Sequence, residues 1–423
     1  MEGFFVNVID LRRDFHRYPE LGFTEFRTAS KVVEVLKFLG YNVLFGEDAI
    51  DSNSRRGVPS KRELDEAYAR ALKYGANLEI IEKMKGGNTA VVGELKGKKE
   101  GPTVAFRFDM DALPIHESSD EDHYPHAEEF SSEFSGNMHA CAHDGHTAMG
   151  LLLAERLADR EFAGTLKLIF QPAEEGGRGG YAMSHKGVVD DVDFLFCSHL
   201  GLDLPLGEVH GGNSKFLASS KMKAYFYGVP SHAGGTPEKG RNALLGAATA
   251  LLNIHAIPRF SGGTTRVNVG ILEGGTAANI IPSEASMVID VRSDKAEIKD
   301  ELEERVKSIV EHSALMHGLT SKIDTIGEAT TIQPDPELVS VVLEEAKQIA
   351  GFTSFKEDCD ISLGSEDASF LIKRVQDRGG KGTYMNIGSP LPAPHHHHKF
   401  DIDEAVLPLA VQLLVRIGKR MLT

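Results

Sequence analysis

The sequence contains only three cysteines in 423 residues, Cys141, Cys197 and Cys359. A sparse and odd-numbered set argues against a disulfide framework and favours a reducing compartment. The first residues also lack the basic segment followed by an apolar segment that marks a secretory signal. We therefore expect a cytoplasmic protein without disulfide bonds.

Long runs of a single residue class are missing as well. No apolar segment has the length of a membrane span. The net charge is −16 and no long Lys/Arg run occurs, which argues against an extended nucleic-acid surface. With 41% hydrophobic and 26% charged residues, the composition is that of a globular protein. Because 423 residues exceed one typical core, we expect two domains and no membrane or nucleic-acid partner.

In the first part of the chain, predicted strands and helices alternate. Strands are expected at 89–95, 103–108, 165–170 and 193–199, with a helix at 146–157. This alternation is typical of an α/β fold with a central sheet covered by helices on both faces. A polar segment at 46–88 interrupts it and contains a predicted helix from about Lys61 to Tyr74, with Ser60 as N-cap.

Residues 214–327 have a different predicted order of elements: strand, helix, two strands, helix and a final strand. This order suits a small α+β sandwich of one sheet and two helices. The chain then returns to the first fold through another helix and ends in a helix. We therefore predict a discontinuous domain of residues 1–213 and 328–423, with the sandwich inserted at 214–327.

Residues 138–146 contain the densest group of potential metal ligands. Cys141 and His143 stand two residues apart, and Asp144 and His146 follow. Buried polar groups need partners, and a divalent metal satisfies a thiolate and an imidazole together, with softer ions favoured. The alternative is a polar turn with one ordinary buried cysteine.

Three further groups follow predicted strands, where sites of open α/β sheets form. They are Asp109, the pair Glu174 and Glu175, and His199. One glutamate could bind a metal while the other takes a proton from an attacking water; the alternative is a solvated acidic turn. Asp109 is predicted to orient a ligand imidazole from behind. A single histidine such as His199 is weak evidence for a metal site. The prediction is stronger because His199 is expected at the same end of the sheet as Asp109 and the two glutamates.

Two histidine-containing segments remain. Residues 395–398 are four consecutive histidines followed by an ordered-looking segment, so we expect one of them to be a ligand rather than a tag or a storage tract. His232 lies beside glycines in a turn between a strand and a helix. It is either a functional residue or a polar residue at a helix start, and the sequence favours neither.

Seven motifs of the chain match those of a known family. They are residues 11–23, 107–114, 138–148, 171–176, 231–234, 242–243 and 274–282. Taken in order over almost the whole chain, they resemble those of peptidase family M20, and within it the amidohydrolase branch, subfamily D. The resemblance implies a metal-dependent exopeptidase-like domain with a central mixed sheet and an inserted lid or dimerisation domain. One departure is Ala142, where the family usually has glycine between the two ligands.

The resemblance implies the role of each site residue. The ligands of two divalent ions, Mn²⁺ or Zn²⁺, are Cys141, His143, Glu175, His199 and His396. His396 is chosen because the family's ligand stands four residues before the aromatic residue that Phe400 matches. The other positions are Glu174 as general base, His232 as a lid histidine that reaches a partner's site, and Asn279 and Arg292 near the substrate.

The expected activity is therefore hydrolysis of the amide bond of an N-acyl amino acid, with p-aminobenzoyl-glutamate as the leading substrate. Since a net charge of −16 does not attract such an anion, a local cation must, and Arg292 is the best candidate. The alternatives are other N-acyl amino acids or dipeptides, or a catalytically silent metal-binding subunit. A homodimer, or a heteromer with a homologous subunit, is expected.

Overall fold

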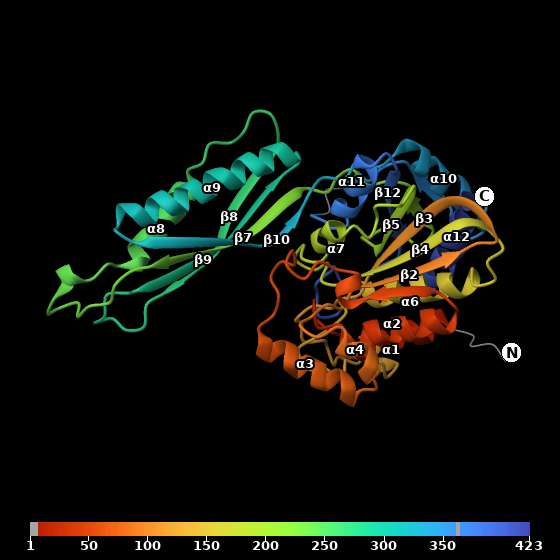
Figure 1. The fold of residues 1–423 in the computed structure, drawn as a ribbon, viewed down its shortest axis with the longest axis horizontal. Coiled ribbons are helices and arrows are strands. Elements are labelled where there is room, and N and C mark those ends of the chain that lie inside the picture. The colour runs from red at the N-terminus through yellow and green to blue at the C-terminus, as the bar shows by residue number, and fades with distance from the viewer. Residues whose placement is uncertain (1–6, 361–363) are drawn as a thin grey trace. The chain divides into compact units, whose positions relative to one another are not determined.

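The computed structural model describes residues 7–360 and 364–423, which form two compact units (Figure 1). The second unit comprises Phe216–Thr331 and Gly364–Glu366, and the other described residues form the first. The predicted insertion, 214–327, differs from the main segment of the second unit by two residues at one end and four at the other. The sequence did not assign residues 364–366 to it.

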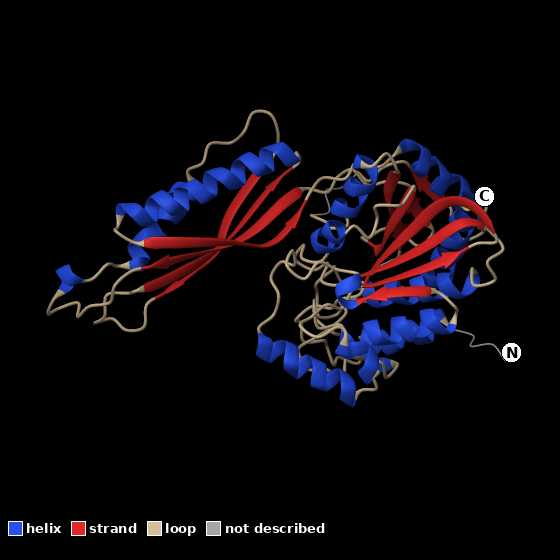
Figure 2. Cartoon of the chain, in the orientation of Figure 1, coloured by secondary structure: helices blue, strands red, loops and turns tan. Residues whose placement is uncertain are grey.

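The first unit is built on an eight-stranded mixed sheet in the order β1-β2-β4-β3-β5-β12-β6-β11 (Figure 2). Its strands are β1 (Asn42–Phe45), β2 (Val91–Lys96), β3 (Lys99–Asp109), β4 (Ala163–Gln171), β5 (Phe194–Gly201), β6 (Glu208–His210), β11 (Ser354–Lys356) and β12 (Lys381–Gly388). The central strands β4, β3, β5 and β12 are parallel to one another. Their carboxyl ends therefore meet at one edge of the sheet, and the predicted α/β class is confirmed.

Helices cover both faces of this sheet. The helices of the first unit are α1 (Val8–Arg17), α2 (Phe26–Phe38), α3 (Lys61–Lys73), α4 (Leu78–Glu82), α5 (Tyr124–Ala127), α6 (His143–Arg156), α7 (Gly180–Lys186), α10 (Pro336–Ala346), α11 (Ser369–Asp377) and α12 (Val406–Met421). Of these, α2, α6, α10, α11 and α12 pack on strands of the sheet. The short elements α4, α5, α7, α11, β6, β11 and β12 were not predicted. Among the described residues, no helix is both long and apolar enough to cross a bilayer.

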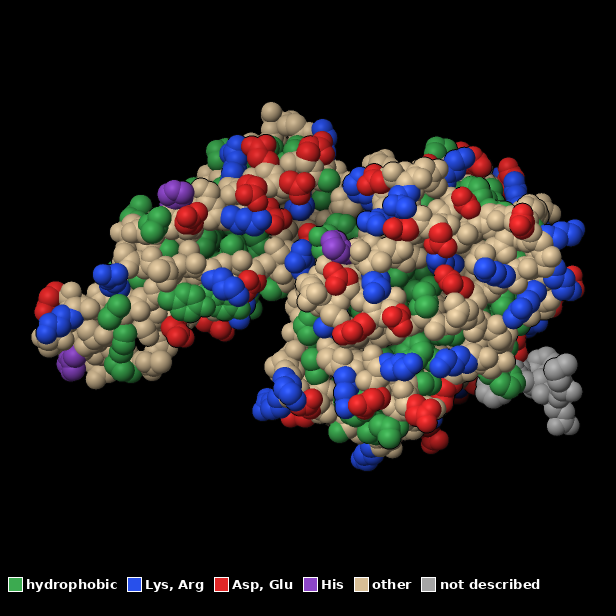
Figure 3. Space-filling view, viewed as in Figure 1, with side chains coloured by type: hydrophobic (Ala, Val, Ile, Leu, Met, Phe, Trp, Pro, Cys, Tyr) green, Lys and Arg blue, Asp and Glu red, His purple; other side chains and the backbone are tan. Residues whose placement is uncertain are grey.

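Charged side chains of both signs are mixed on the surface of the first unit. On the face drawn in Figure 3, lysine and arginine side chains lie among aspartates and glutamates, with hydrophobic side chains between them. Opposite charges that alternate over short distances cancel at longer range. Attraction of a charged molecule to this face therefore depends on local groups rather than on a broad field.

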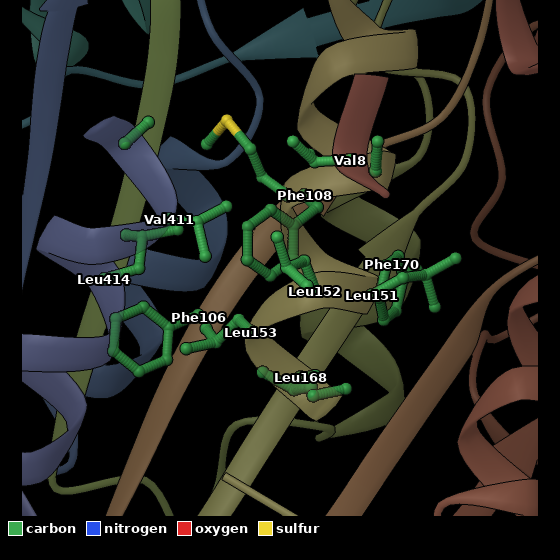
Figure 4. Packing of buried hydrophobic residues seen from close by; sticks show 14 of the residues in the cluster. Val8, Phe106, Phe108, Leu151, Leu152, Leu153, Leu168, Phe170, Val411 and Leu414 are labelled. Atoms are coloured by element: carbon green, nitrogen blue, oxygen red, sulfur yellow. The ribbon is translucent and has the colours of Figure 1, made fainter. Parts of the chain in front are cut away.

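The main core lies between the sheet and helices α6 and α12 (Figure 4). Phe106 and Phe108 of β3 pack there with leucines of α6 and with Val411 and Leu414 of α12. Gly150 brings α6 close to the sheet, because a Cβ at this position would lie 2.6 Å from the Phe108 ring. This close packing places the first residue of α6, His143, beside the carboxyl end of β3.

The polar segment after β1 folds onto the first unit through α3 and α4. Ser60 caps α3 as predicted: its hydroxyl accepts from the backbone of Glu63, and the Glu63 carboxylate accepts from the backbone of Ser60. Leu64 and Ala67 of α3 and Ile81 of α4 are buried. The segment is thus a packed part of the first unit rather than a solvated linker.

The second unit is a four-stranded antiparallel sheet in the order β10-β7-β9-β8. Its elements are β7 (Ala218–Tyr227), α8 (Ala243–His255), β8 (Thr265–Gly274), β9 (Glu284–Ser293), α9 (Ala296–Met316) and β10 (Thr320–Ala329). Helices α8 and α9 lie along one face of the sheet and share a core with its buried side chains (Figure 2). The observed order of elements is the predicted one.

Candidate metal centre

The five predicted ligands and Glu174 lie in one cluster at the carboxyl edge of the first unit's sheet. Potential ligand atoms lie within 4.8 Å of one another in three overlapping groups. These groups are Cys141, His143 and His199; Cys141, Glu175 and His396; and His143, Glu174 and Glu175. Because Cys141, His143 and Glu175 each belong to two of these three groups, the cluster offers donors for two neighbouring ions.

The two buried histidines are held by backbone carbonyls. His143 Nδ1 lies 2.8 Å from the carbonyl oxygen of Asp111, and His199 Nδ1 lies 2.7 Å from that of Leu200. Such bonds fix the tautomer that leaves Nε2 as a metal donor. Within the described residues, the buried Nε2 of His143 makes no hydrogen bond. That of His199 lies 3.5 Å from Cys141 Sγ, so both rings fit a metal site.

The two glutamates lie in a turn three and four residues beyond the end of β4, rather than at the strand end itself. The carboxylate of Asp111 accepts hydrogen bonds of 3.0 Å from the backbone N–H groups of both Glu174 and Glu175. Their side chains are only 13% and 12% exposed. Asp111 therefore holds the turn that presents both carboxylates, a role that the sequence analysis missed although the residue follows a predicted strand.

Asp109 orients a different imidazole from the expected ligands. Its Oδ1 lies 2.5 Å from Nδ1 of His146, and its Oδ2 lies 2.6 Å from Arg107 but 3.8 Å from His143 Nε2. Burial opposes ionisation of Asp109, but His143, His146 and Arg107 outweigh it and hold its pKa well below the usual range. The carboxylate thus stays charged behind the cluster. His146 in turn accepts from the backbone of Leu200.

The Cys141 thiol needs a cation to ionise. Burial raises the pKa of this thiol well above its usual range, and the nearby Glu175 carboxylate raises it further. A metal ion bound beside a thiol deprotonates it and removes this penalty. The protein forms no disulfide through Cys141, Cys197 or Cys359, so Cys141 is chemically available for this role.

Two of the four consecutive histidines reach the cluster. His396 Nε2 lies 3.2 Å from Glu175 Oε1, and its side chain is 53% exposed. His395 uses both ring nitrogens, with Nδ1 3.3 Å from Cys141 Sγ and Nε2 accepting from the backbone of Leu202. Burial lowers the pKa of His395 to about 3, so its ring is neutral. The geometry favours His396 as the ligand. The rings of His397 and His398 stack on each other.

Ala142 separates two candidate ligands in a left-handed backbone conformation. Its φ is +67° and its side chain is fully buried. A left-handed residue with a Cβ costs roughly 1–2 kcal/mol, which gives a physical reason why glycine suits this position. The turn lets Cys141 and His143 face the same cluster although only one residue lies between them.

A buried network of charges lies behind the cluster. The fully buried guanidinium of Arg12 donates to Asp144, Asp401 and Glu404. Nδ1 of His16 lies 2.7 Å from Asp144, whose neighbour is His143. The network ties the first turn of α6 to α1 and to the segment after the histidine run. The sequence analysis did not identify it.

The remaining predicted site residues belong to the second unit. His232 is exposed, and its Nδ1 accepts from the backbone of Gly234 and Gly235. The next residue donates its backbone N–H to the carbonyl of Asn279, so His232 and Asn279 lie in paired loops. Arg292 lies on β9, where its Nε donates to Asp290 at 2.8 Å.

Comparisons with known proteins agree with this cluster and fold. Residues 105–420 match the family described as Peptidase family M20/M25/M40. The chain belongs to this family and is a metal-dependent hydrolase. It is 45% identical to an indole-3-acetyl-aspartic acid hydrolase of Enterobacter agglomerans, over 95% of this chain and 93% of that protein.

Two further relatives carry related names. The chain is 42% identical to a p-aminobenzoyl-glutamate hydrolase subunit of Escherichia coli strain K12, over 96% of this chain and 93% of that protein. The crystal structure of an aminobenzoyl-glutamate utilization protein from Klebsiella pneumoniae matches with a TM-score of 0.86 and 39% identity, covering 98% of this chain and 95% of that one. The expected resemblance to the M20 family is therefore confirmed.

Proposed function

We propose that the protein hydrolyses the amide bond of N-acyl amino acids whose amino acid is glutamate or aspartate, with p-aminobenzoyl-glutamate as the leading substrate. The observation that carries this proposal is the cluster of five donors with Glu174 beside it. The names of the relatives support the choice of substrate, since they describe an acyl-aspartate and an acyl-glutamate hydrolase.

The donors of the cluster fit two divalent ions. Cys141, His143, Glu175, His199 and His396 would hold them, and the unbonded Nε2 of His143 and the partly buried thiol support this assignment. When bound, such ions polarise a carbonyl and lower the pKa of water. A thiolate and three imidazoles favour Zn²⁺, and Mn²⁺ is the alternative.

Glu174 is the proposed general base. Its Oε2 lies 3.9 Å from His143 Nε2, so it sits beside the ligands. It would take a proton from the attacking water and return it to the leaving amine. His232 would stabilise the developing oxyanion, and Asn279 and Arg292 would contact the substrate. A catalytically silent metal-binding protein has no use for Glu174 in this position, which favours an enzyme.

The assay that tests the proposal is amine release from a matched panel. It contains p-aminobenzoyl-glutamate, indole-acetyl-aspartate, N-acyl amino acids with neutral side chains and simple dipeptides, each with the Zn²⁺ and the Mn²⁺ enzyme. We expect the acidic conjugates to have the highest kcat/KM. A preference for neutral acyl amino acids or dipeptides would favour those alternatives, and no release from any compound with either metal would contradict the proposed substrate class.

We also propose that the second unit pairs with a second chain of the same fold, either another copy or a homologous subunit. β8 is an edge strand, and it exposes Ile271 and Leu272 (49% and 40%). α8 exposes Leu245 and Leu252 (53% and 70%). An exposed apolar edge strand with a neighbouring apolar helix is a typical pairing surface. Two relatives are named as subunits, which supports a partner.

Mixing two inactive variants tests whether His232 serves the partner's site. In randomly mixed twofold dimers of Glu174→Ala and His232→Ala chains, half of the dimers would contain one complete site, so about a quarter of the activity should return. Full activity of a monomer at high dilution would contradict this arrangement. We also propose that the protein is cytoplasmic, as its sparse cysteines lead us to expect.

A further inference from the structure

The sheet of the second unit has one face that none of that unit's helices covers. Met222, Ala224 and Phe226 of β7 and Met287 and Ile289 of β9 point to the face that packs on α8 and α9. Because side chains alternate along a strand, the intervening residues point to the other face. We call this second side the open face; Lys221 and Lys223 of β7 lie on it, as do Asp290 and Arg292 of β9.

Two arginines stand directly opposite each other on the open face. Arg266 of β8 is the register partner of Arg292 of β9. Directly opposed residues of an antiparallel pair have Cβ atoms about 5 Å apart, and like charges in such positions repel. On the next strand, the same row continues with Ser219 of β7, which carries no charge.

The carboxylates on this face do not neutralise the pair. Asp290 accepts only from the Nε of Arg292, at 2.8 Å. Within the part of the chain that the structure describes, Arg266 makes no ion pair, and its side chain bonds only the carbonyl of Thr265. In the neighbouring row, Asn268 and Lys221 flank Asp290 on either side. Two guanidinium groups and a lysine thus accompany a single carboxylate.

We propose that Arg266 is a specificity-determining residue that acts with Arg292 as a two-guanidinium site for dicarboxylate amino acids. The inference rests on the proposed function and deepens it. An acyl-glutamate or acyl-aspartate carries two carboxylates, and guanidinium groups bind carboxylates bidentately. Two arginines side by side on adjacent strands match two carboxylates on one small molecule, and binding of that molecule removes the repulsion between them.

Two arginines explain a preference for acidic over neutral N-acyl amino acids, which a single arginine does not. Any N-acyl amino acid carries an α-carboxylate, so one guanidinium suffices to bind acidic and neutral substrates alike. A second guanidinium leaves a charge without a partner when the substrate side chain is neutral. Discrimination of this kind depends on the penalty for the unpaired group as well as on the new bond.

The kinetic experiment compares p-aminobenzoyl-glutamate with p-aminobenzoyl-glutamine, which has the same shape and one charge less. Because hydrogen bonds between charged groups are the stronger ones, Arg266→Gln should raise KM for the glutamate compound about tenfold or more. Its kcat, and the kcat/KM for the glutamine compound, should stay within about twofold. Arg266→Lys, which keeps the charge without the bidentate geometry, should lie between the two.

Lys322→Gln is the matched control, because Lys322 lies on the open face three rows away and pairs with Asp324 at 2.7 Å. It should leave both substrates unchanged. Equal KM changes for the two compounds in Arg266→Gln, or no change for either, would overturn the role of Arg266. So would a loss of the same size in Lys322→Gln, since that would indicate a general effect of surface charge.

A binding measurement separates this inference from the proposed function. Glutarate, a dicarboxylate that cannot be hydrolysed, is titrated calorimetrically into the metal-loaded parent enzyme and into Arg266→Gln. The parent should bind glutarate more tightly than the variant does, even if it hydrolyses neither substrate. Equal affinity in parent and variant, including no binding to either, would overturn the two-arginine site whatever the assay of activity shows.

Discussion

The candidate residues of the two units are held in different ways. In the first unit, His143, His199 and the two glutamates are largely buried, and backbone carbonyls or a carboxylate fix each of them. In the second unit, Arg266, His232 and Asn279 are exposed and make few side-chain contacts. The first set is preorganised for an ion, whereas the second becomes fully bonded only when a substrate or another chain supplies partners.

Glu174→Ala should produce the largest effect on activity. General acid–base groups contribute about 10²- to 10⁴-fold, so kcat should fall by that factor. Metal content should remain that of the parent, because the proposed role of Glu174 is proton transfer. Elemental analysis beside the turnover assay checks this, with Glu175→Ala as the companion that should lose metal. If Glu174→Ala loses metal and activity to the same degree, the two roles are exchanged.

Arg12→Leu should produce the largest loss of stability. The substitution leaves Asp144 and Asp401 buried without their cation, and breaking a buried ion pair in this way typically costs about 3–5 kcal/mol. Urea unfolding measures this loss. Lys61→Ala is the control, because the Lys61–Asp65 pair is solvent-exposed and surface substitutions usually change stability by about 0.5 kcal/mol or less. Equal effects in the two variants would show that the network does not stabilise the fold.

His16 should make the stability of the first unit depend on pH. Burial opposes protonation of His16, as does Arg12, but the carboxylates of Glu117 and Asp144 outweigh them and raise its pKa from 6.5 to about 9. A raised folded-state pKa stabilises the fold fully below about 6.5, and this contribution is lost as pH rises through about 9.

The shift corresponds to about 3 kcal/mol. The difference in unfolding free energy between the parent and His16→Gln should therefore be largest at low pH and should shrink by about that amount between pH 6.5 and 9. A difference that grows with pH over this range would mean that His16 is neutral in the folded protein.

Cys141→Ser should weaken metal binding. A hydroxyl is a harder and far less acidic ligand than a thiol. Since loss of groups that merely support ligands already costs about tenfold or more in affinity, at least that loss is expected here. Competition with a chelator gives the affinity. Unchanged affinity and metal content would make Cys141 a structural residue.

Arg292→Ala, in the second unit, should have the smallest effect of these substitutions. KM should rise about tenfold for acyl-glutamates and by a similar factor for neutral acyl amino acids, because Arg292 is left to bind the α-carboxylate that both carry when Arg266 binds the side-chain carboxylate. Stability should change little, because the side chain is partly exposed and its carboxylate partner lies on the same strand. A loss confined to acyl-glutamates would instead assign the side-chain carboxylate to Arg292 and contradict the division of roles between the two arginines.

Local signals in the sequence predicted the elements best. Ser60 and Glu63 form the capping box that begins α3, and the order of strands and helices in the second unit follows from alternation alone. Ligand types were visible because Cys141 and His143 stand close in sequence. The extent of α6 was underestimated, since a helix beginning at His143 requires the left-handed Ala142 before it, which no side-chain pattern indicates.

Long-range partners could not be predicted. Arg12 and His16 are polar residues of α1, and their burial depends on carboxylates more than 100 residues away. Strand β12 could not be predicted either. It is short, it begins beside glycines, and its parallel partner β5 lies nearly 190 residues earlier in the chain. The pairing of Asp109 with His146 rather than with His143 depends on angles that spacing does not determine.

The pairing of β12 with β5 also sets an order for synthesis on the ribosome. β5 ends at Gly201 and its neighbour β12 does not emerge until Gly388, so the catalytic sheet cannot close before then. Asp401 and Glu404, the partners of Arg12, emerge later still. The strands and helices of the second unit are contiguous between these points. They can fold first while the earlier strands wait, a period in which unpaired strand edges are exposed to aggregation and to chaperones.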